Sequence, residues 1–186
     1  ALLLENWFQN NSIPFQRENN NVWAVNLHYD ASKPTLLLNS HHDTVKPNEG
    51  YTLNPFEAIE KDGKLFGLGS NDAGGCLVSL LATFTYFYAY ENLPYNILFA
   101  GTAEEESSGP NGLNGLLKHL PEIECAIVGE PRCSWPLLKK DFLSWISSFP
   151  EQQVMRPIKT QTIQFTMHLP LLNGSGRMNL KRYLKY

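Results

Sequence analysis

The sequence predicts an α/β fold in which a mostly parallel sheet carries helices on both faces. Apolar runs of strand length alternate with segments of helical length up to about residue 130, and this alternation is typical of parallel sheets. Several of the apolar runs end directly in histidine or acidic residues, at the strand ends where α/β sheets collect their ligands. The 186 residues, 42% of them hydrophobic, are enough for one ordinary domain of this class.

Each element is expected from a local pattern. Short apolar runs that close with polar residues are expected to be strands. Asp72 is expected to cap the longest helix, which continues to about Tyr90, because its carboxylate can accept from the first free amides. The expected strands are 22–27, 35–39, 96–100 and 125–128, and the other expected helices are 2–8 and 113–120.

The composition excludes several classes of protein. A net charge of −3 gives no electrostatic reason to expect a nucleic acid as partner. No apolar run approaches the roughly 18 residues of a membrane span, and the N-terminus lacks the charged start of a signal peptide. The three cysteines form no C-x-x-C pair, which favours a reducing compartment. We therefore expect a cytoplasmic protein with no nucleic-acid or membrane partner.

The chain divides into two parts of different composition at Pro131. Residues 1–131 hold 6 basic and 16 acidic side chains, net −10, whereas residues 132–186 hold 9 and 2, net +7. All three methionines but only 2 of the 13 glycines fall in the second part, which keeps neither strand nor helix periodicity for long. We expect one ordered unit over 1–131 and a poorly ordered tail over 132–186.

Histidine and acidic residues gather after the expected strands. Because the carboxyl ends of parallel strands meet at one edge of a sheet, these side chains are expected to lie together. Imidazole with several carboxylates suits zinc or a similar divalent ion. The residues are His41, His42 and Asp43 after the strand 35–39, Glu104, Glu105 and Glu106 after 96–100, Glu130 after 125–128, and Asp72 after a glycine-rich turn.

Each cluster alone also has an ordinary structural interpretation. His41 and Asp43 lie two apart and point the same way if the strand continues, but a solvated strand end has the same pattern. Three consecutive glutamates are usually a charged surface, and a single Asp72 or Glu130 is most often a helix cap or a loop residue. His42 is expected to point away from its neighbours and to pack or face solvent.

Taken in order, the motifs resemble those of the M20 family of binuclear zinc aminoacylases and peptidases. The family's H-x-D is matched by His41-His42-Asp43, and its G-x-G-x-x-D by Gly67-Leu-Gly-Ser-Asn-Asp72. Its D-E-E is matched by Glu104-Glu105-Glu106, with glutamate in place of the usual aspartate, and its G-E-P by Gly129-Glu130-Pro131. The resemblance covers about residues 2–131 and implies an incomplete zinc-peptidase-like catalytic domain.

The resemblance implies a role for each residue. His41 and Glu130 would hold one zinc, Asp72 would bridge two, and Glu106 would bind the second, with Co²⁺ as an alternative metal. Glu105 would be the general base that activates water against an amide carbonyl, and Asp43 would orient His41. The family also has a cis peptide after the bridging aspartate, which would fall at Asp72-Ala73.

The substrate implied is a small N-acyl amino acid or a dipeptide. Residues 38–45 look most like bacterial acetylornithine deacetylase, an enzyme of amino-acid biosynthesis. Family members are often dimeric through a lid domain, and the lid also helps to choose the substrate, but no lid is recognisable here. The alternative is an inactive remnant that lacks the lid and the last metal ligand.

Residues 132–186 look like a frameshifted reading of the family sequence. Joining the third base of each codon to the first two of the next permits family-like segments over 138–145 and 152–157. The change in composition at Pro131 supports the same hypothesis independently.

Overall fold

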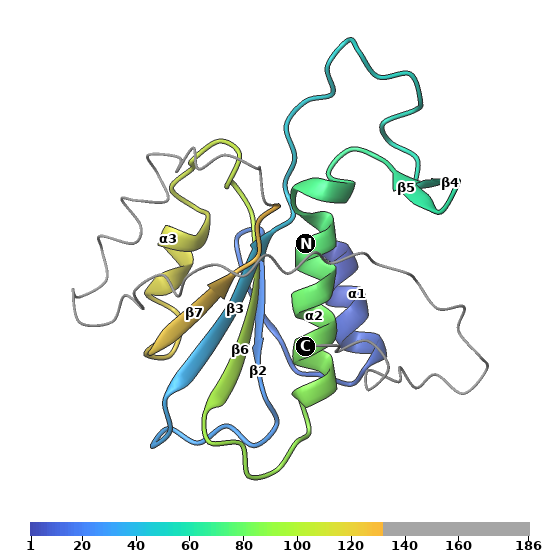
Figure 1. Cartoon of the computed structure of the whole chain (residues 1–186). Coiled ribbons are helices and arrows are strands. Elements are labelled where there is room, and N and C mark those ends of the chain that lie inside the picture. The colour runs from blue at the N-terminus through green and yellow to red at the C-terminus, as the bar shows by residue number, and fades with distance from the viewer. Residues whose placement is uncertain (132–186) are drawn as a thin grey trace, which may run out of the picture. The chain divides into compact units, whose positions relative to one another are not determined.

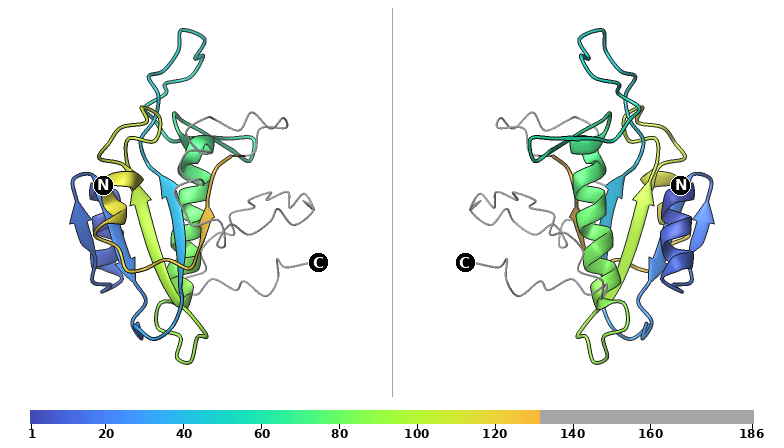
Figure 2. Two further views of the ribbon diagram at one scale, coloured as in Figure 1. Left: turned by 90° about the vertical axis from the view of Figure 1, so that its left-hand side faces the viewer. Right: turned by 90° about the vertical axis from the view of Figure 1, so that its right-hand side faces the viewer.

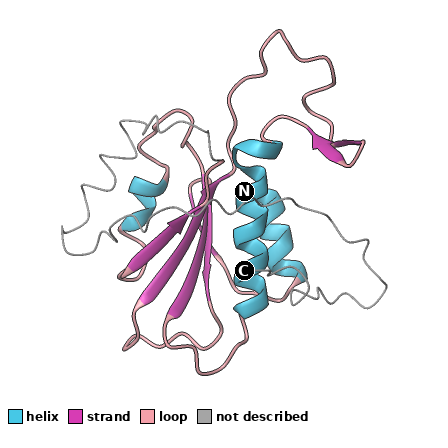
Figure 3. Cartoon of the chain, in the orientation of Figure 1, coloured by secondary structure: helices cyan, strands magenta, loops and turns pink. Residues whose placement is uncertain are grey.

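The computed structural model describes residues 1–131, and the expectations for 132–186 lie outside the described residues. The described helices lie on both sides of one main sheet, and a small hairpin lies apart from it (Figures 1 and 3). The strands are β1 (Gln16–Glu18), β2 (Asn21–Val25), β3 (Thr35–His41), β4 (Ile59–Lys61), β5 (Lys64–Phe66), β6 (Asn96–Thr102) and β7 (Cys125–Val128). The helices are α1 (Leu2–Asn10), a π-helical turn η1 (Ser70–Gly75), α2 (Cys76–Phe87) and α3 (Leu113–Leu117).

The main sheet has the strand order β1-β2-β6-β3-β7 and is mixed. β3 pairs in parallel with both β6 and β7, as the alternation of strands and helices predicts. β2 runs antiparallel to both β1 and β6. Its pairing with β1 is a hairpin over a tight turn at Asn19, whose φ is 56°. The α/β class is confirmed, and the parallel part of its sheet is the part that carries the histidine and acidic motifs.

Apolar side chains fill both faces of the sheet, so helices cover both, as predicted. On one face α1 and α2 pack against β2, β3 and β6, and on the other α3 does so. Phe8 of α1 has no exposed surface and contacts the rings of Phe84 and Phe99. The buried core residues are Leu4, Phe8, Ile13, Val22, Ala24, Leu38, Leu77, Leu81, Phe84, Ile97 and Phe99 on the first face and Trp23, Leu37, Leu98, Ala100 and Leu116 on the second.

The start of α2 differs from the prediction. Asp72 does not cap the helix: its backbone is non-helical, at φ −110° and ψ 102°, and α2 begins at Cys76 without a side-chain cap. The chain turns at Gly69, whose φ is 75°. A Cβ at this position would clash with the side chain of Thr44, so only glycine fits. This turn sends the Asp72 carboxylate towards β3. The peptide Asp72-Ala73 is cis, as the resemblance implied.

The segment between β3 and η1 extends beyond the carboxyl ends of the strands (Figure 2). It carries the β4–β5 hairpin, which turns at Asp62 and Gly63, both with positive φ. Most of its side chains are exposed. No helix within residues 1–131 combines the length and the apolar character that crossing a bilayer requires.

Candidate metal centre

His41 is the last residue of β3 and lies at the carboxyl end of the parallel strands. Its side chain is only 1% exposed, and its backbone is in register with Thr102 of β6. The Nδ1 atom lies 3.1 Å from the backbone oxygen of Asp43 and 3.4 Å from its carboxylate. Because both of these oxygens only accept, Nδ1 carries the proton, and Nε2 is the atom that faces the rest of the site.

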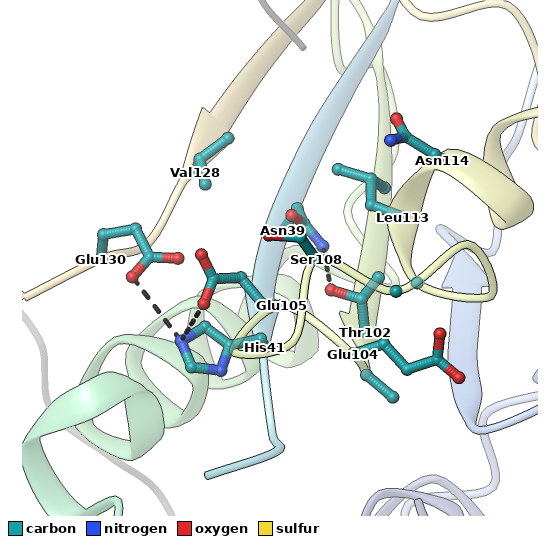
Figure 4. Close-up of a pocket in the computed structure, with 13 residues that line it drawn as sticks. Asn39, His41, Thr102, Glu104, Glu105, Ser108, Leu113, Asn114, Val128 and Glu130 are labelled. Atoms are coloured by element: carbon teal, nitrogen blue, oxygen red, sulfur yellow. Dashed lines mark hydrogen bonds and ion pairs between the residues drawn. The ribbon is translucent and has the colours of Figure 1, made fainter. Parts of the chain in front are cut away.

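Three carboxylates from three separate segments converge on His41 Nε2. Asp72 of η1 lies at 3.1 Å, Glu130 after β7 at 3.6 Å, and Glu105 after β6 at 3.8 Å. Figure 4 shows Glu105 and Glu130 pointing at the imidazole from two sides. The sequence therefore places these acids at one edge of the sheet, and the fold brings them within contact of one buried ring.

This concentration of negative charge changes the protonation of His41. Burial lowers the pKa of the imidazole, but the hydrogen bond and charge of Glu130, followed by the charges of Glu105 and Asp43, outweigh it and raise the pKa to about 9. The site thus favours a positive charge at Nε2. A divalent cation supplies that charge at the same position.

The donor set fits a metal ion. His41, Asp72 and Glu106 each offer one ligand atom, and these atoms lie within 4.8 Å of one another. One imidazole nitrogen with carboxylate oxygens is a ligand set for zinc and similar divalent ions. Glu130 approaches the same His41 nitrogen at 3.6 Å but is not part of this group of three.

Asp43 connects the histidine to the glutamate loop, a contact that the sequence did not reveal. Its two carboxylate oxygens accept the backbone amides of Glu105 at 3.3 Å and Glu106 at 3.1 Å. The same side chain faces Nδ1 of His41. Asp43 therefore contacts both the imidazole and the loop that carries Glu105 and Glu106.

Glu104 and His42 lie outside this group of contacts. The Glu104 carboxylate points away from His41 in Figure 4 and binds Asn111 instead. His42 directs Nε2 to the backbone oxygen of Asn20 at 2.8 Å, and burial lowers its pKa. Its position matches the expectation that it points away from its neighbours.

A pocket of about 290 Å³ opens beside His41, Glu105 and Glu130. Sequence reasoning did not select its neutral polar residues. Asn39 gave no signal in the sequence, because a polar residue is expected to close the apolar run 35–39; its buried amide donates to the backbone oxygen of Ala100 and to Thr102. The pocket residues not foreseen are Asn39, Thr102, Ala103, Ser108, Gly109, Gly112, Leu113, Asn114 and Val128.

Comparison with known proteins identifies the family. Residues 37–143 match the model of peptidase family M20/M25/M40. The chain belongs to this family. A succinyl-diaminopimelate desuccinylase from Wigglesworthia glossinidia brevipalpis is 36% identical over 118 residues, which is 60% of this chain and 30% of the relative. An acetylornithine deacetylase from Pasteurella multocida is 32% identical over 144 residues, which is 73% of this chain and 36% of the relative.

Solved structures share the fold. A metallo-carboxypeptidase of the M20 family from Sulfolobus solfataricus has a TM-score of 0.56 at 21% identity, over 69% of this chain and 31% of that one. Human carnosine dipeptidase 1 has a TM-score of 0.52 at 19% identity, over 71% and 32%. The chain spans about a third of the length of these relatives. The M20 family is metal-dependent, in agreement with the donor set around His41.

Proposed function

We propose that this chain forms the metal-binding part of a hydrolase that cleaves the amide bond of N-acyl amino acids. One observation carries the proposal: the buried His41 Nε2 faces carboxylates delivered by η1, by the β6 loop and by the end of β7. The relatives named above, a desuccinylase and a deacetylase, support an acyl amino acid as the substrate class.

The residues divide into two ligand sets that share Asp72. His41 and Glu130 would hold one ion and Glu106 the other, with zinc as the physiological metal and cobalt as a substitute. When bound, a pair of such ions supplies Lewis acidity to a carbonyl and lowers the pKa of water. The exposed side of Asp72 supports the bridging role, because half of its side chain faces solvent while Oδ1 faces His41.

Glu105 is proposed as the general base. Its carboxylate lines the pocket and lies beside the metal ligands without being needed as one of them. It would accept one proton from water as the oxygen attacks the amide carbonyl, and would return that proton to the amine as the carbon–nitrogen bond breaks. The products are a carboxylic acid and an amino acid, so atoms and protons balance.

Asp43 acts on the ligands and base without touching the substrate. It fixes the Nδ1 proton of His41, so that Nε2 presents its lone pair towards the site. It also accepts hydrogen bonds from the backbone amides of Glu105 and Glu106, and so sets the distance between the proposed base, Glu105, and the proposed ligand, Glu106.

The acyl group is the finer part of the proposal. We expect an acetyl group, as in acetylornithine deacetylase, because residues 38–45 look most like that enzyme. A succinyl group is the competing expectation, supported by the desuccinylase relative. A cytoplasmic location and dimerisation through a lid stay predictions.

The test uses the 186-residue chain loaded with Zn²⁺ or Co²⁺. Bound metal is measured by equilibrium dialysis, and amide hydrolysis is followed with N-acetylornithine and N-succinyl-diaminopimelate. Close to two ions per chain with turnover supports the hydrolase. Metal binding without turnover of either compound supports the inactive remnant, and absence of metal binding rules out the metal centre. Glu105→Gln should abolish turnover while keeping the metal, whereas Glu122→Gln, outside the site, should leave both unchanged.

A further inference from the structure

The loop between β6 and α3, residues 103–112, carries Glu105 and Glu106 and is closed at its base by one buried side chain. Asn21 of β2 has no exposed surface. Its Oδ1 accepts the amide of Ala103 at 3.0 Å, and its Nδ2 donates to the backbone oxygen of Asn111 at 2.7 Å. Asn21 thus attaches both ends of the loop to β2, and the hydrogen bond to its backbone oxygen holds Asn111 in place.

The Glu104 side chain lies inside this loop and reaches Asn111. One carboxylate oxygen accepts the Asn111 amide at 2.9 Å, and the other accepts Asn111 Nδ2 at 3.2 Å. Its backbone oxygen accepts the amide of Gly109 at 2.9 Å. A Cβ on Gly109 would overlap the Glu104 side chain, so the glycine leaves room for it. Both carboxylate oxygens therefore accept hydrogen bonds within the loop.

This arrangement requires Glu104 to adopt an unfavourable backbone conformation. Its φ is 59°, in the left-handed region that glutamate rarely occupies. The turn it makes sends its own side chain away from His41 and the Glu105 side chain towards it (Figure 4). Glu106 offers a ligand atom in the same group as His41 and Asp72. Two hydrogen bonds to a charged acceptor offset the cost of that conformation.

The need for such a brace follows from the charges in the site. Glu105 approaches the same His41 nitrogen as Asp72 and Glu130, Glu106 lies close to His41 and Asp72, and like charges at short range repel. The Asp43 contact to the two amides restrains the loop on the side that faces His41. A second attachment on the far side of the loop opposes this repulsion.

We propose that Glu104 is a positioning residue, which braces the loop against Asn111 so that Glu105 and Glu106 face His41. The consequences for metal binding rest on the proposed function, whereas the brace itself concerns only the protein. Nothing in the acidic run of the sequence distinguishes Glu104 from its two neighbours in this way.

The experiment compares Glu104→Ala, Glu104→Gln and Asn111→Ala with the wild type and with the control Glu122→Gln in the 186-residue chain. Hydrogen exchange of the amides in residues 105–112 is measured without metal. We expect exchange about tenfold faster in Glu104→Ala, a smaller increase in Glu104→Gln, which keeps one carbonyl acceptor, and none in the control. Asn111→Ala should fall between, because it keeps its backbone amide for Glu104.

Cobalt binding supplies the second measurement. Glu104→Ala should weaken Co²⁺ affinity by about tenfold and change the visible absorption of the bound ion, with partial recovery in Glu104→Gln. Unchanged exchange in the loop, or unchanged affinity and absorption in a wild-type chain that binds Co²⁺, would overturn the proposal. If the wild type binds no Co²⁺, the proposed function fails, and the exchange measurement alone decides whether the brace exists.

Discussion

Nε2 of His41 lies 3.1 Å from Oδ1 of Asp72, although 31 positions separate the two residues in the sequence. The contact exists because β3 ends at the point where the turn at Gly69 leads into α2. It joins the first and second motifs of the family into one centre.

Removing the imidazole should abolish tight metal binding. His41 is buried and offers the only nitrogen atom in the group of possible metal ligands found in the described part of the chain. We expect His41→Ala to weaken Zn²⁺ affinity by well over tenfold, measured by competition with a chelating dye. His42→Ala is the matched control, because its ring faces Asn20, and it should keep the wild-type affinity. Equal losses in both variants would contradict the assignment.

Asp43 should matter even though it is not expected to touch the metal. Asp43→Asn keeps the shape of the side chain but weakens its acceptance of the His41 and loop N–H groups. Changes of this kind typically cost 10–100-fold in metal affinity or activity. Equilibrium dialysis with Co²⁺ measures the loss, and an Asp43→Asn protein with wild-type affinity would show that the contacts are incidental.

Metal affinity should depend on pH through His41. In the metal-free protein its pKa is about 9, above the ordinary value of 6.5, so the ring is protonated at neutral pH and must lose that proton when a metal binds. Apparent affinity should rise about tenfold per pH unit up to about pH 9 and then level off. Calorimetry at pH 7.5 in buffers of different ionisation enthalpy should detect about one proton released from this ring.

The same pKa makes a prediction for stability without metal. A pKa raised by folding means that the folded state binds the proton more tightly, so the stabilising contribution is complete below pH 6.5 and is lost as pH rises through 9. Denaturant unfolding of wild type and His41→Gln across this range should show the difference between them shrinking. A constant difference would argue against a charged His41.

Packing of α1 should be a large part of the stability of the described unit. Phe8 has no exposed surface and contacts the rings of Phe15, Phe84 and Phe99. Phe8→Ala should lower the free energy of unfolding by about 3–5 kcal/mol, because it removes apolar burial and leaves a cavity. The exposed Leu3→Ala on the same helix is the control and should change it by less than about 0.5 kcal/mol.

Strands made of apolar runs were predicted correctly, because in them the local pattern of hydrophobic residues determines the structure. The apolar strand 125–128 has the predicted bounds, and β3 and β6 extend their predicted strands by two residues each, because polar residues at strand ends still pair. β1 was missed because its residues are polar and exposed. The β4–β5 hairpin was missed although Asp62-Gly63, a hairpin turn signal, stands at its centre.

The candidate site was predictable as a set of residue types but not as a set of contacts. The motifs indicate which acids gather at the strand ends. They do not indicate that the Asp43 carboxylate accepts two backbone amides, or that Glu104 turns away from its neighbours, because both depend on a loop conformation fixed by distant Asn21 and Asn111. The predicted helix cap at Asp72 is absent because the Asp72 carboxylate contacts His41 instead.

Asp72 provides the last prediction, because a cap and a metal ligand respond differently to substitution. Losing a helix cap costs about 0.5–2 kcal/mol, whereas Asp72 makes no cap hydrogen bond. Asp72→Asn should therefore change the free energy of unfolding of the metal-free protein by less than about 0.5 kcal/mol at pH 10, where His41 is neutral. The same variant should lose metal affinity by well over tenfold at pH 7.5, because Asp72 faces His41 Nε2. A stability loss at pH 10 with unchanged metal binding would restore the capping role and remove Asp72 from the centre.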